Sequence, residues 1–341
     1  MKRLDGFMKG VNFGGWLSQG EYTKEHLDSF ITADDFRKAA SWGIDHIRVP
    51  VDYNIFGEDG GTPSEEGLAY VQKAIDLCGE NGLNMVLDLH KTYGYSFYDG
   101  YNEAGFFDSE ELQEKFCKLW ECFAQRFGKY SDRLAFELLN EVTEQSYSKK
   151  WNAIAAKTIG IIRKYSPDIK IFIGSYWNNS VDALCDLDAP ADENIVYNFH
   201  CYDPFIFTHQ AAYWVPEMRP DFRISYPGNK KEYTEKLVEL GLTRVQDLTD
   251  VPENGFDSKY FEERFEKAVR LCEERGAALY CGEYGVIDQA SAEDALGWFR
   301  DINAAFEKFG IGRSVWNFKE KDFGLCDDHL APVLPELVKY L

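Results

Sequence analysis

Short apolar runs alternate with longer amphipathic segments along most of the chain. The apolar runs, typical of buried strands, cover residues 8–13, 44–49, 83–90, 134–141, 169–174, 194–200, 277–283 and 312–318. The segments with a helical period cover residues 32–42, 64–81, 108–128, 148–165, 181–187, 258–275, 292–309 and about 335–340. Strands that alternate with helices predict parallel pairing through crossovers, and eight such units favour a closed (β/α)8 barrel.

Local signals support several of these boundaries. Thr32 with Asp35 three residues later is a helix start, and Gly82 suits a helix end. Pro50 is expected to end the second strand. A doubly wound open sheet is the alternative, but no glycine-rich phosphate loop follows the first strand.

The regular alternation is interrupted once, over residues 203–257. A loop this long rarely stays without structure of its own. We therefore expect one catalytic domain, residues 1–341, with a small subdomain at 203–257 over the carboxyl-terminal face of the barrel.

Two carboxylates stand out because each follows an apolar, strand-like run. Glu141 closes Leu139-Asn140-Glu141, and Glu283 lies in Cys281-Gly282-Glu283-Tyr284-Gly285. Two carboxyl groups that face one bond are the minimal equipment for cleaving a glycosidic linkage. Since the two strings are far apart in sequence, only the fold can bring them together.

Other polar and aromatic residues also end predicted strands, where the chemistry of such barrels is located. They are Arg48, His90, Asn140, Trp177, His200, Tyr202 and Trp316. Glu137 shares the side of its strand with Glu141 and so points into the barrel. We interpret Glu137 as a buried structural carboxylate with an Arg or His partner.

Charge narrows the choice of partner. The chain has 37 basic and 58 acidic residues, a formal net charge of −21. Nucleic acids and anionic membranes would be repelled, so a neutral substrate is expected.

The eight cysteines show no paired spacing and are expected to be reduced. No run is apolar enough for a membrane span, and the first residues lack the apolar core of a signal peptide. The expectation is a cytoplasmic protein, or one exported by another route or after removal of its signal.

The motifs resemble glycoside hydrolase family 5, and particularly the small single-domain bacterial endoglucanases of the endoglucanase C type. The resemblance extends nearly end to end. It rests on residues 10–16, 46–50, 136–141, 197–200, 280–286 and 315–317, and on the segment from Thr208 to Trp214. The family usually has proline after its acid/base glutamate, whereas Val142 stands there in this chain.

The resemblance implies a role for each candidate. Glu141 would be the acid/base and Glu283 the nucleophile, held ionised by Arg48 and Tyr202. Asn140 would bind the sugar 2-hydroxyl, His90 the sugar, and His200 would bind Glu141. Trp316 would lie beneath the sugar at the cleaved bond, with a cis peptide expected between Trp316 and Asn317. More distant subsites would use Trp214, Trp177 and Trp16.

The activity that the resemblance implies is an endo-acting β-glucanase that retains anomeric configuration. Retention requires the two carboxyl groups to lie about 5–5.5 Å apart. The expected substrates are cellulose-type and mixed-linkage β-glucans or their oligosaccharides, bound by a monomer that needs no cofactor. Mannan, xyloglucan and β-1,3-glucan stay open as substrates.

Two other classes of protein are weighed against this hypothesis. A metal-dependent hydrolase would use Asp88, His90 and His200 as ligands. However, such barrels usually offer a His-x-His pair on the first strand, which this chain lacks. A non-catalytic carbohydrate-binding protein would be expected to have lost one of the two carboxylates.

Overall fold

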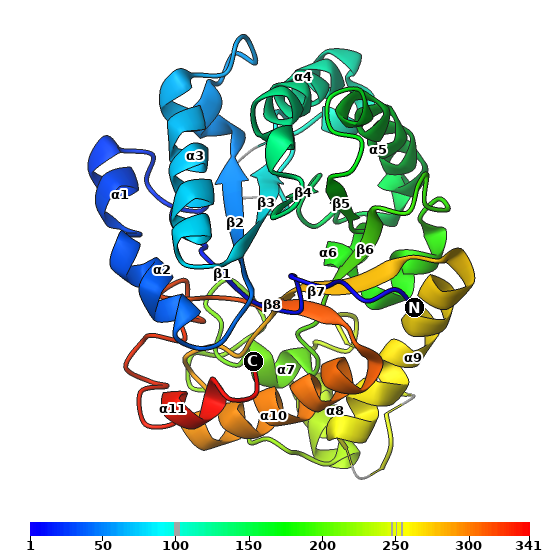
Figure 1. Ribbon diagram of the computed structural model, residues 1–341. Coiled ribbons are helices and arrows are strands. Elements are labelled where there is room, and N and C mark those ends of the chain that lie inside the picture. The colour runs from blue at the N-terminus through cyan, green and yellow to red at the C-terminus, as the bar shows by residue number, and fades with distance from the viewer. Residues whose placement is uncertain (99–102, 247, 250, 254) are drawn as a thin grey trace.

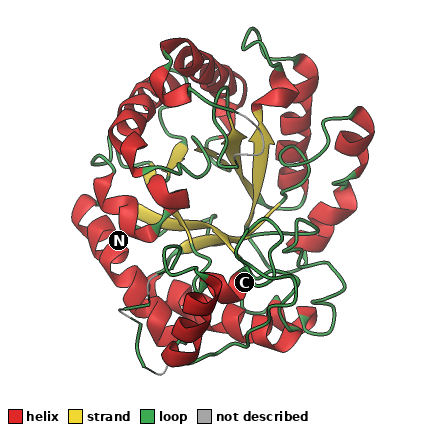
Figure 2. Ribbon diagram, turned by 180° about the vertical axis from the view of Figure 1, so that it is seen from behind, coloured by secondary structure: helices red, strands yellow, loops and turns green. Residues whose placement is uncertain are grey.

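A computed structural model describes residues 1–98, 103–246, 248–249, 251–253 and 255–341. Eight parallel strands close into a barrel in chain order, so the predicted (β/α)8 fold is confirmed. The strands are β1 Lys9–Asn12, β2 His46–Asp52, β3 Asn84–Lys91, β4 Leu134–Glu137, β5 Lys170–Ile173, β6 Ile195–His200, β7 Ala278–Tyr284 and β8 Gly312–Val315. Figures 1 and 2 show them in the middle of the molecule with helices around them.

Helices cover the outside of the barrel, and the long ones match the amphipathic segments of the sequence. They are α1 Lys24–Ser29, α2 Ala33–Ala40, α3 Glu65–Glu80, α4 Glu110–Phe127, α5 Ser148–Arg163, α6 Tyr176–Asn179, α7 Phe205–Thr208, α8 Lys230–Leu240, α9 Ser258–Arg275, α10 Ala292–Phe309 and α11 Leu334–Leu337. The predicted capping box at Thr32 and Asp35 is present. Among the described residues, no helix is both long and apolar enough to cross a membrane.

Three local predictions are corrected. Strand β2 continues through Pro50 to Asp52. Its Arg48 carbonyl and Asp52 N–H pair with the chain after β1, and alternation turns the nitrogen of Pro50 to that same side, where its missing N–H interrupts no pairing with β3. Strand β4 ends at Glu137, four residues before Glu141. The segment 181–187 is a 3-10 helix over Val181–Asp186.

The segment between β6 and α9 contains α7 and α8, neither of which was predicted. Its buried Tyr226, Tyr233 and Phe256 belong to the main hydrophobic core. That residues 203–257 form a subdomain of their own stays a prediction.

The interior of the barrel changes character from its floor upward. At the floor, an apolar cluster contains Phe7, Val86, Phe172 and Tyr280 among others. Two residues further along six of the strands, the inward side chains are polar, and on β7 the inward position is Gly282. This layer consists of Asn12, Arg48, Asp88, Glu137, Asn198, Gly282 and Ser314. Alternation turns these side chains inward, and the stagger of the strands in the barrel brings them together beneath the carboxyl-terminal ends.

Close packing of the floor makes a stability prediction at Gly10. A Cβ there would lie 2.3 Å from Nε2 of His46, whose ring also bonds to the hydroxyl of Tyr280. We expect Gly10→Ala to lower the free energy of unfolding by about 1–3 kcal/mol in urea denaturation, because the ring has to shift. In the control Gly160→Ala, on an exposed face of α5, the new methyl group meets nothing and should add about 0.5–1 kcal/mol. Equal stability of Gly10→Ala and the unsubstituted protein would contradict close packing at the floor.

Candidate active site

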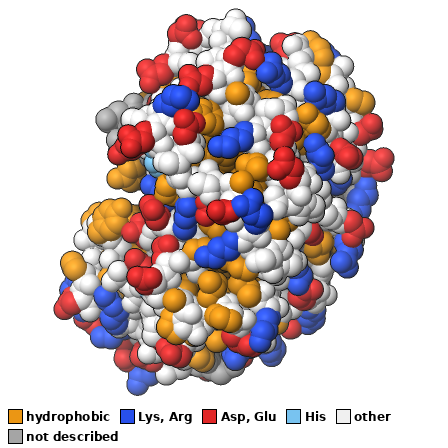
Figure 3. Space-filling view, turned by 60° about the vertical axis from the view of Figure 1, so that its left-hand side comes forward, with side chains coloured by type: hydrophobic (Ala, Val, Ile, Leu, Met, Phe, Trp, Pro, Cys, Tyr) orange, Lys and Arg blue, Asp and Glu red, His pale blue; other side chains and the backbone are white. Residues whose placement is uncertain are grey.

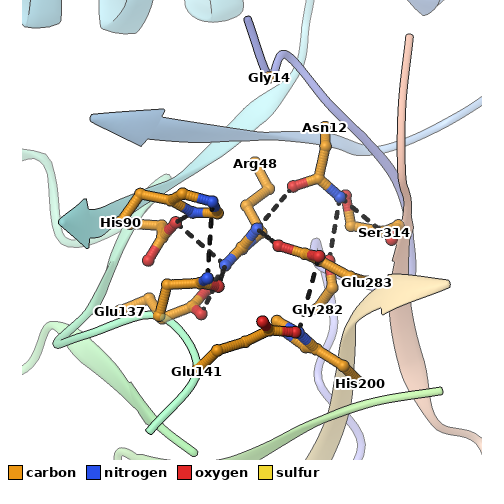
Figure 4. Close-up of polar contacts among 12 residues, drawn as sticks. Asn12, Gly14, Arg48, His90, Glu137, Glu141, His200, Gly282, Glu283 and Ser314 are labelled. Atoms are coloured by element: carbon orange, nitrogen blue, oxygen red, sulfur yellow. Dashed lines mark hydrogen bonds and ion pairs between the residues drawn. The ribbon is translucent and has the colours of Figure 1, made fainter. Parts of the chain in front are cut away.

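The guanidinium of Arg48 lies at the centre of the site and is fully buried (Figure 4). It donates through Nε and Nη2 to both carboxylate oxygens of Glu137, each at 2.7 Å. It also donates through Nη1 to Glu283 at 2.8 Å and lies 3.0 Å from Asp88. One cation therefore faces three carboxylates, in contacts that are strong because water is excluded.

Two amide side chains complete the surroundings of Arg48. Asn12 accepts from Nη1 at 2.8 Å, and its own amide donates to the Gly282 carbonyl at 3.0 Å. Asn140 accepts from Nη2 at 2.9 Å. Strands β1, β2, β4 and β7 are thus held together through one side chain.

Glu283 extends from β7 toward Glu141 and is 5% exposed. Besides Arg48, it accepts a hydrogen bond from the Tyr202 hydroxyl at 3.0 Å. Burial raises the pKa of Tyr202, so this hydroxyl keeps its proton and remains a donor. Two donors, one of them a cation, suit the ionised form of a carboxyl group.

Glu141 faces Glu283 from the segment after β4, with a positive φ of 38°. Its Oε1 lies 2.8 Å from Nδ1 of His200, and its Oε2 accepts from the Asn178 amide at 3.0 Å. Burial raises the pKa of Glu141 and lowers that of His200 to about 4. A carboxyl group in this setting holds its proton to higher pH than an exposed one.

The carboxylates of Glu141 and Glu283 and the ring of His200 each offer an atom within 4.8 Å of the others. Among the described residues, this is the group of three potential metal ligands whose atoms lie close enough together to hold one ion. It is a different set from the predicted Asp88, His90 and His200. An oxygen of each carboxylate within 4.8 Å of the other is compatible with the about 5–5.5 Å separation of a retaining glycosidase.

His90, near the end of β3, and Trp316, directly after β8, contact each other. Their rings are stacked with centroids 5.6 Å apart and planes 7° from parallel. His90 bonds to Asp88 through Nδ1 at 2.6 Å and to Gln19 through Nε2 at 2.8 Å. The peptide bond from Trp316 to Asn317 is cis, as predicted.

The remaining predicted tryptophans differ in placement. Trp177 is 53% exposed and Trp214 is half-buried beside Trp316 and Phe323. Trp16 was wrongly predicted to line a subsite. It is fully buried in the core, and its indole N–H donates to the Leu27 carbonyl, so it has no surface to offer a sugar. Figure 3 shows the molecular surface hollowed at one edge, with hydrophobic side chains beside the hollow.

Several residues of the site were missed from sequence, namely Asn12, Gln19 and Asn178. Asn12 ends β1 and could have been found by the strand-end argument applied to the other strands. Gln19 and Asn178 lie in irregular segments, where a sequence pattern gives no direction for the side chain. Asn178 belongs to a turn with three consecutive left-handed residues, Trp177, Asn178 and Asn179.

Comparison with known proteins gives consistent matches over most of the chain. The family model described as cellulase (glycosyl hydrolase family 5) matches residues 8–322. Cellodextrinase A of Ruminococcus flavefaciens is 44% identical over 92% of this chain and 86% of its own length. Endoglucanase C of Acetivibrio thermocellus is 36% identical over 98% of each chain. The solved endoglucanase of Thermotoga maritima superposes with a TM-score of 0.76 over 98% of this chain and 97% of its own, at 24% identity, which shows the shared fold.

The contacts of Glu137 predict a structural role. Its carboxylate is fully buried, accepts both bonds from Arg48 and a third from the Asn198 amide at 2.8 Å. Glu137→Gln removes the charge that pairs with Arg48, and we expect urea denaturation to show a loss of about 3–5 kcal/mol. The control Glu65→Gln breaks an exposed pair with Arg126 and should change stability by less than ~1 kcal/mol.

In the folded Glu137→Gln protein, we expect the turnover rate to be affected less strongly than the free energy of unfolding. Unchanged stability together with abolished turnover would assign Glu137 to the chemistry instead.

Proposed function

The chain belongs to the cellulase family, glycosyl hydrolase family 5, and from this premise we propose that it is a retaining endo-β-glucanase that cleaves β-1,4 linkages in cellulose-type and mixed-linkage β-glucans. The observation that carries the proposal is the facing pair Glu141 and Glu283, with oxygens within 4.8 Å. They lie in opposite environments: donors surround Glu283, while burial raises the pKa of Glu141.

The proposed reaction has two displacements. The carboxylate of Glu283 attacks the anomeric carbon, and Glu141 gives its proton to the departing glycosidic oxygen. A covalent glycosyl-enzyme and the shortened chain result. Glu141, now ionised, takes a proton from water as that water attacks the anomeric carbon, which releases Glu283 and restores both groups. Two inversions leave the anomeric configuration unchanged.

Surrounding residues would position the sugar. The Asn140 amide nitrogen lies 3.5 Å from Nε2 of His90, so both side chains face the same space above Arg48. We assign Asn140 to the sugar 2-hydroxyl and His90 to a neighbouring hydroxyl. Trp316 would stack beneath the sugar ring, and the exposed Trp177 and half-buried Trp214 would contact sugars further along the chain.

Oligosaccharides should be assayed as well as polysaccharides, because the relative that is 44% identical is named a cellodextrinase. The first experiment compares reducing-end release from mixed-linkage β-glucan, cellulose and cello-oligosaccharides. Mannan, xyloglucan and β-1,3-glucan serve as the alternatives. Release from none of them, with sugar binding retained, would favour a carbohydrate-binding protein.

Azide distinguishes the roles of the two glutamates. On 2,4-dinitrophenyl β-cellobioside, Glu283→Ala with azide should give the α-glycosyl azide, because azide then attacks the substrate directly. Glu141→Ala with azide should give the β-glycosyl azide, because azide attacks the covalent intermediate. Proton NMR reads both products, and an inverted first product from the unsubstituted enzyme would refute the double displacement.

The pH profile should report Glu141 on its alkaline side. The acid works only when protonated, so kcat/KM should fall as the pH rises through the pKa of Glu141, which burial raises. Glu141→Ala should lose this alkaline limb and about 10²–10⁴-fold of its rate on a poor leaving group. An unchanged limb in Glu141→Ala would assign the titration to another residue.

Metal analysis and an assay in the presence of a chelator test the metal-dependent alternative. That alternative requires the activity to be lost when the metal ion is removed.

A further inference from the structure

The side chain of Asn178 reaches the reacting carboxyl group from outside the barrel strands. Its amide donates to Oε2 of Glu141 at 3.0 Å, while His200 occupies Oε1. Asn178 itself is exposed at the rim of the site, so it contributes little to the core. The contact that its side chain makes is therefore the hydrogen bond to the carboxyl group of Glu141, and not packing in the hydrophobic core.

The backbone that carries Asn178 is strained. Trp177, Asn178 and Asn179 have φ values of 52°, 54° and 56°. The left-handed conformation costs roughly 1–2 kcal/mol for each residue other than glycine, and somewhat less for asparagine. Strain of this kind persists where the surrounding structure enforces it, and it gathers at functional sites.

Two backbone bonds attach this turn to the segment that carries the acid. The Trp177 N–H donates to the Thr143 carbonyl at 3.2 Å, and the Asn178 N–H donates to the Val142 carbonyl at 3.0 Å. Val142 directly follows Glu141. The turn and the acid therefore share one local frame, which fixes the amide of Asn178 relative to the carboxyl group.

Asn179 acts on the other oxygen through His200. It is fully buried, and its amide nitrogen lies 3.4 Å from Nε2 of His200. Because the pKa of His200 is lowered to about 4, the ring is neutral near pH 6 and has one N–H. An amide donor at Nε2 places that proton on Nδ1, directed at Oε1 of Glu141. A side chain on Gly174 would collide with the Asn179 amide at 2.1 Å, so a bare backbone is needed there.

We propose that the left-handed turn 177–179 is a positioning element for the acid/base, in which Asn178 holds Oε2 of Glu141 directly and Asn179 holds Oε1 through His200. This rests on the proposed function of Glu141. An amide donor stabilises the carboxylate formed as the proton leaves more than it stabilises the neutral acid. Asn178 thus favours proton delivery to the departing oxygen.

The charged groups around Glu141 define what a pH profile measures. His200 faces it from β6, Glu283 from β7, Arg48 from β2 and His90 from β3. The Asn178 hydrogen bond, Arg48 and His90 lower the pKa of Glu141 against the larger opposite effect of burial. Removing only the amide should therefore raise this pKa and move the alkaline limb to higher pH.

The test uses Asn178→Gly and Asn178→Asp, because both residues tolerate the left-handed backbone while neither supplies the amide donor. Phenyl β-cellobioside needs protonation of its leaving group, and 2,4-dinitrophenyl β-cellobioside does not. We expect Asn178→Gly to lose roughly 10- to 100-fold in kcat/KM on the phenyl substrate. It should lose about threefold or less on the dinitrophenyl substrate. In both variants the alkaline limb should move to higher pH, and further in Asn178→Asp, where a second carboxylate adjoins the acid.

The control Asn152→Ala removes an amide that donates to the Asp186 carbonyl on the outer surface. It should change neither the ratio between the two substrates nor the limb. Equal losses on both substrates with an unmoved limb, or no loss, would overturn the positioning role. Full activity of Glu141→Ala on the phenyl substrate would instead refute the proposed function, so the two failures are distinguishable. Thermal unfolding of each variant confirms that the compared proteins are folded.

Discussion

The buried guanidinium of Arg48 is the interaction on which the rest of the site depends. It is the common partner of Glu137, Asp88 and Glu283, and it orders the amides of Asn12 and Asn140. A buried charge without partners would be very costly, so each contact is required by the others. Since these partners come from β1, β3, β4, β7 and the segment after β4, the same interaction that satisfies Arg48 also sets the distances between the carboxyl groups of the site.

The barrel could be predicted from sequence because its signal is regular. Eight apolar runs alternate with amphipathic segments, and parallel pairing brings their carboxyl ends to one rim. His90, His200 and Glu283 were found by that argument because each lies at or next to the end of its strand, whereas Arg48 was found because the predicted second strand ended too early, before Pro50. Glu137 was correctly placed inside by the two-residue alternation, which is local geometry that needs no knowledge of the partner strand.

The rest depends on contacts that no local pattern encodes. Trp16 follows the first strand as a candidate should, but its ring packs against Phe36 in the core. The sequence predicts a strand end at Pro50. The strand continues because β1 is too short to pair with Pro50, so no hydrogen bond from its nitrogen is needed. The side chains of Asn178 and Asn179 are directed by a left-handed turn that is held by the loop after Glu141. In each case a tertiary neighbour, and not the residue type, decides the outcome.

The imbalance of charge around Arg48 has a consequence for ligands other than the substrate. Three carboxyl groups surround one fixed cation, and both imidazoles are neutral at pH 7 because burial lowers their pKa values. Burial raises the pKa of Asp88 to about 7 and also raises that of Glu137. The surplus of negative charge in this water-poor cavity therefore grows as the pH rises through 7. It suits the positive character that an anomeric carbon gains as its bond to the leaving oxygen stretches. A sugar-shaped amine that carries its positive charge permanently would meet the same field in its resting state, so basic nitrogen should add affinity here that ring shape alone does not.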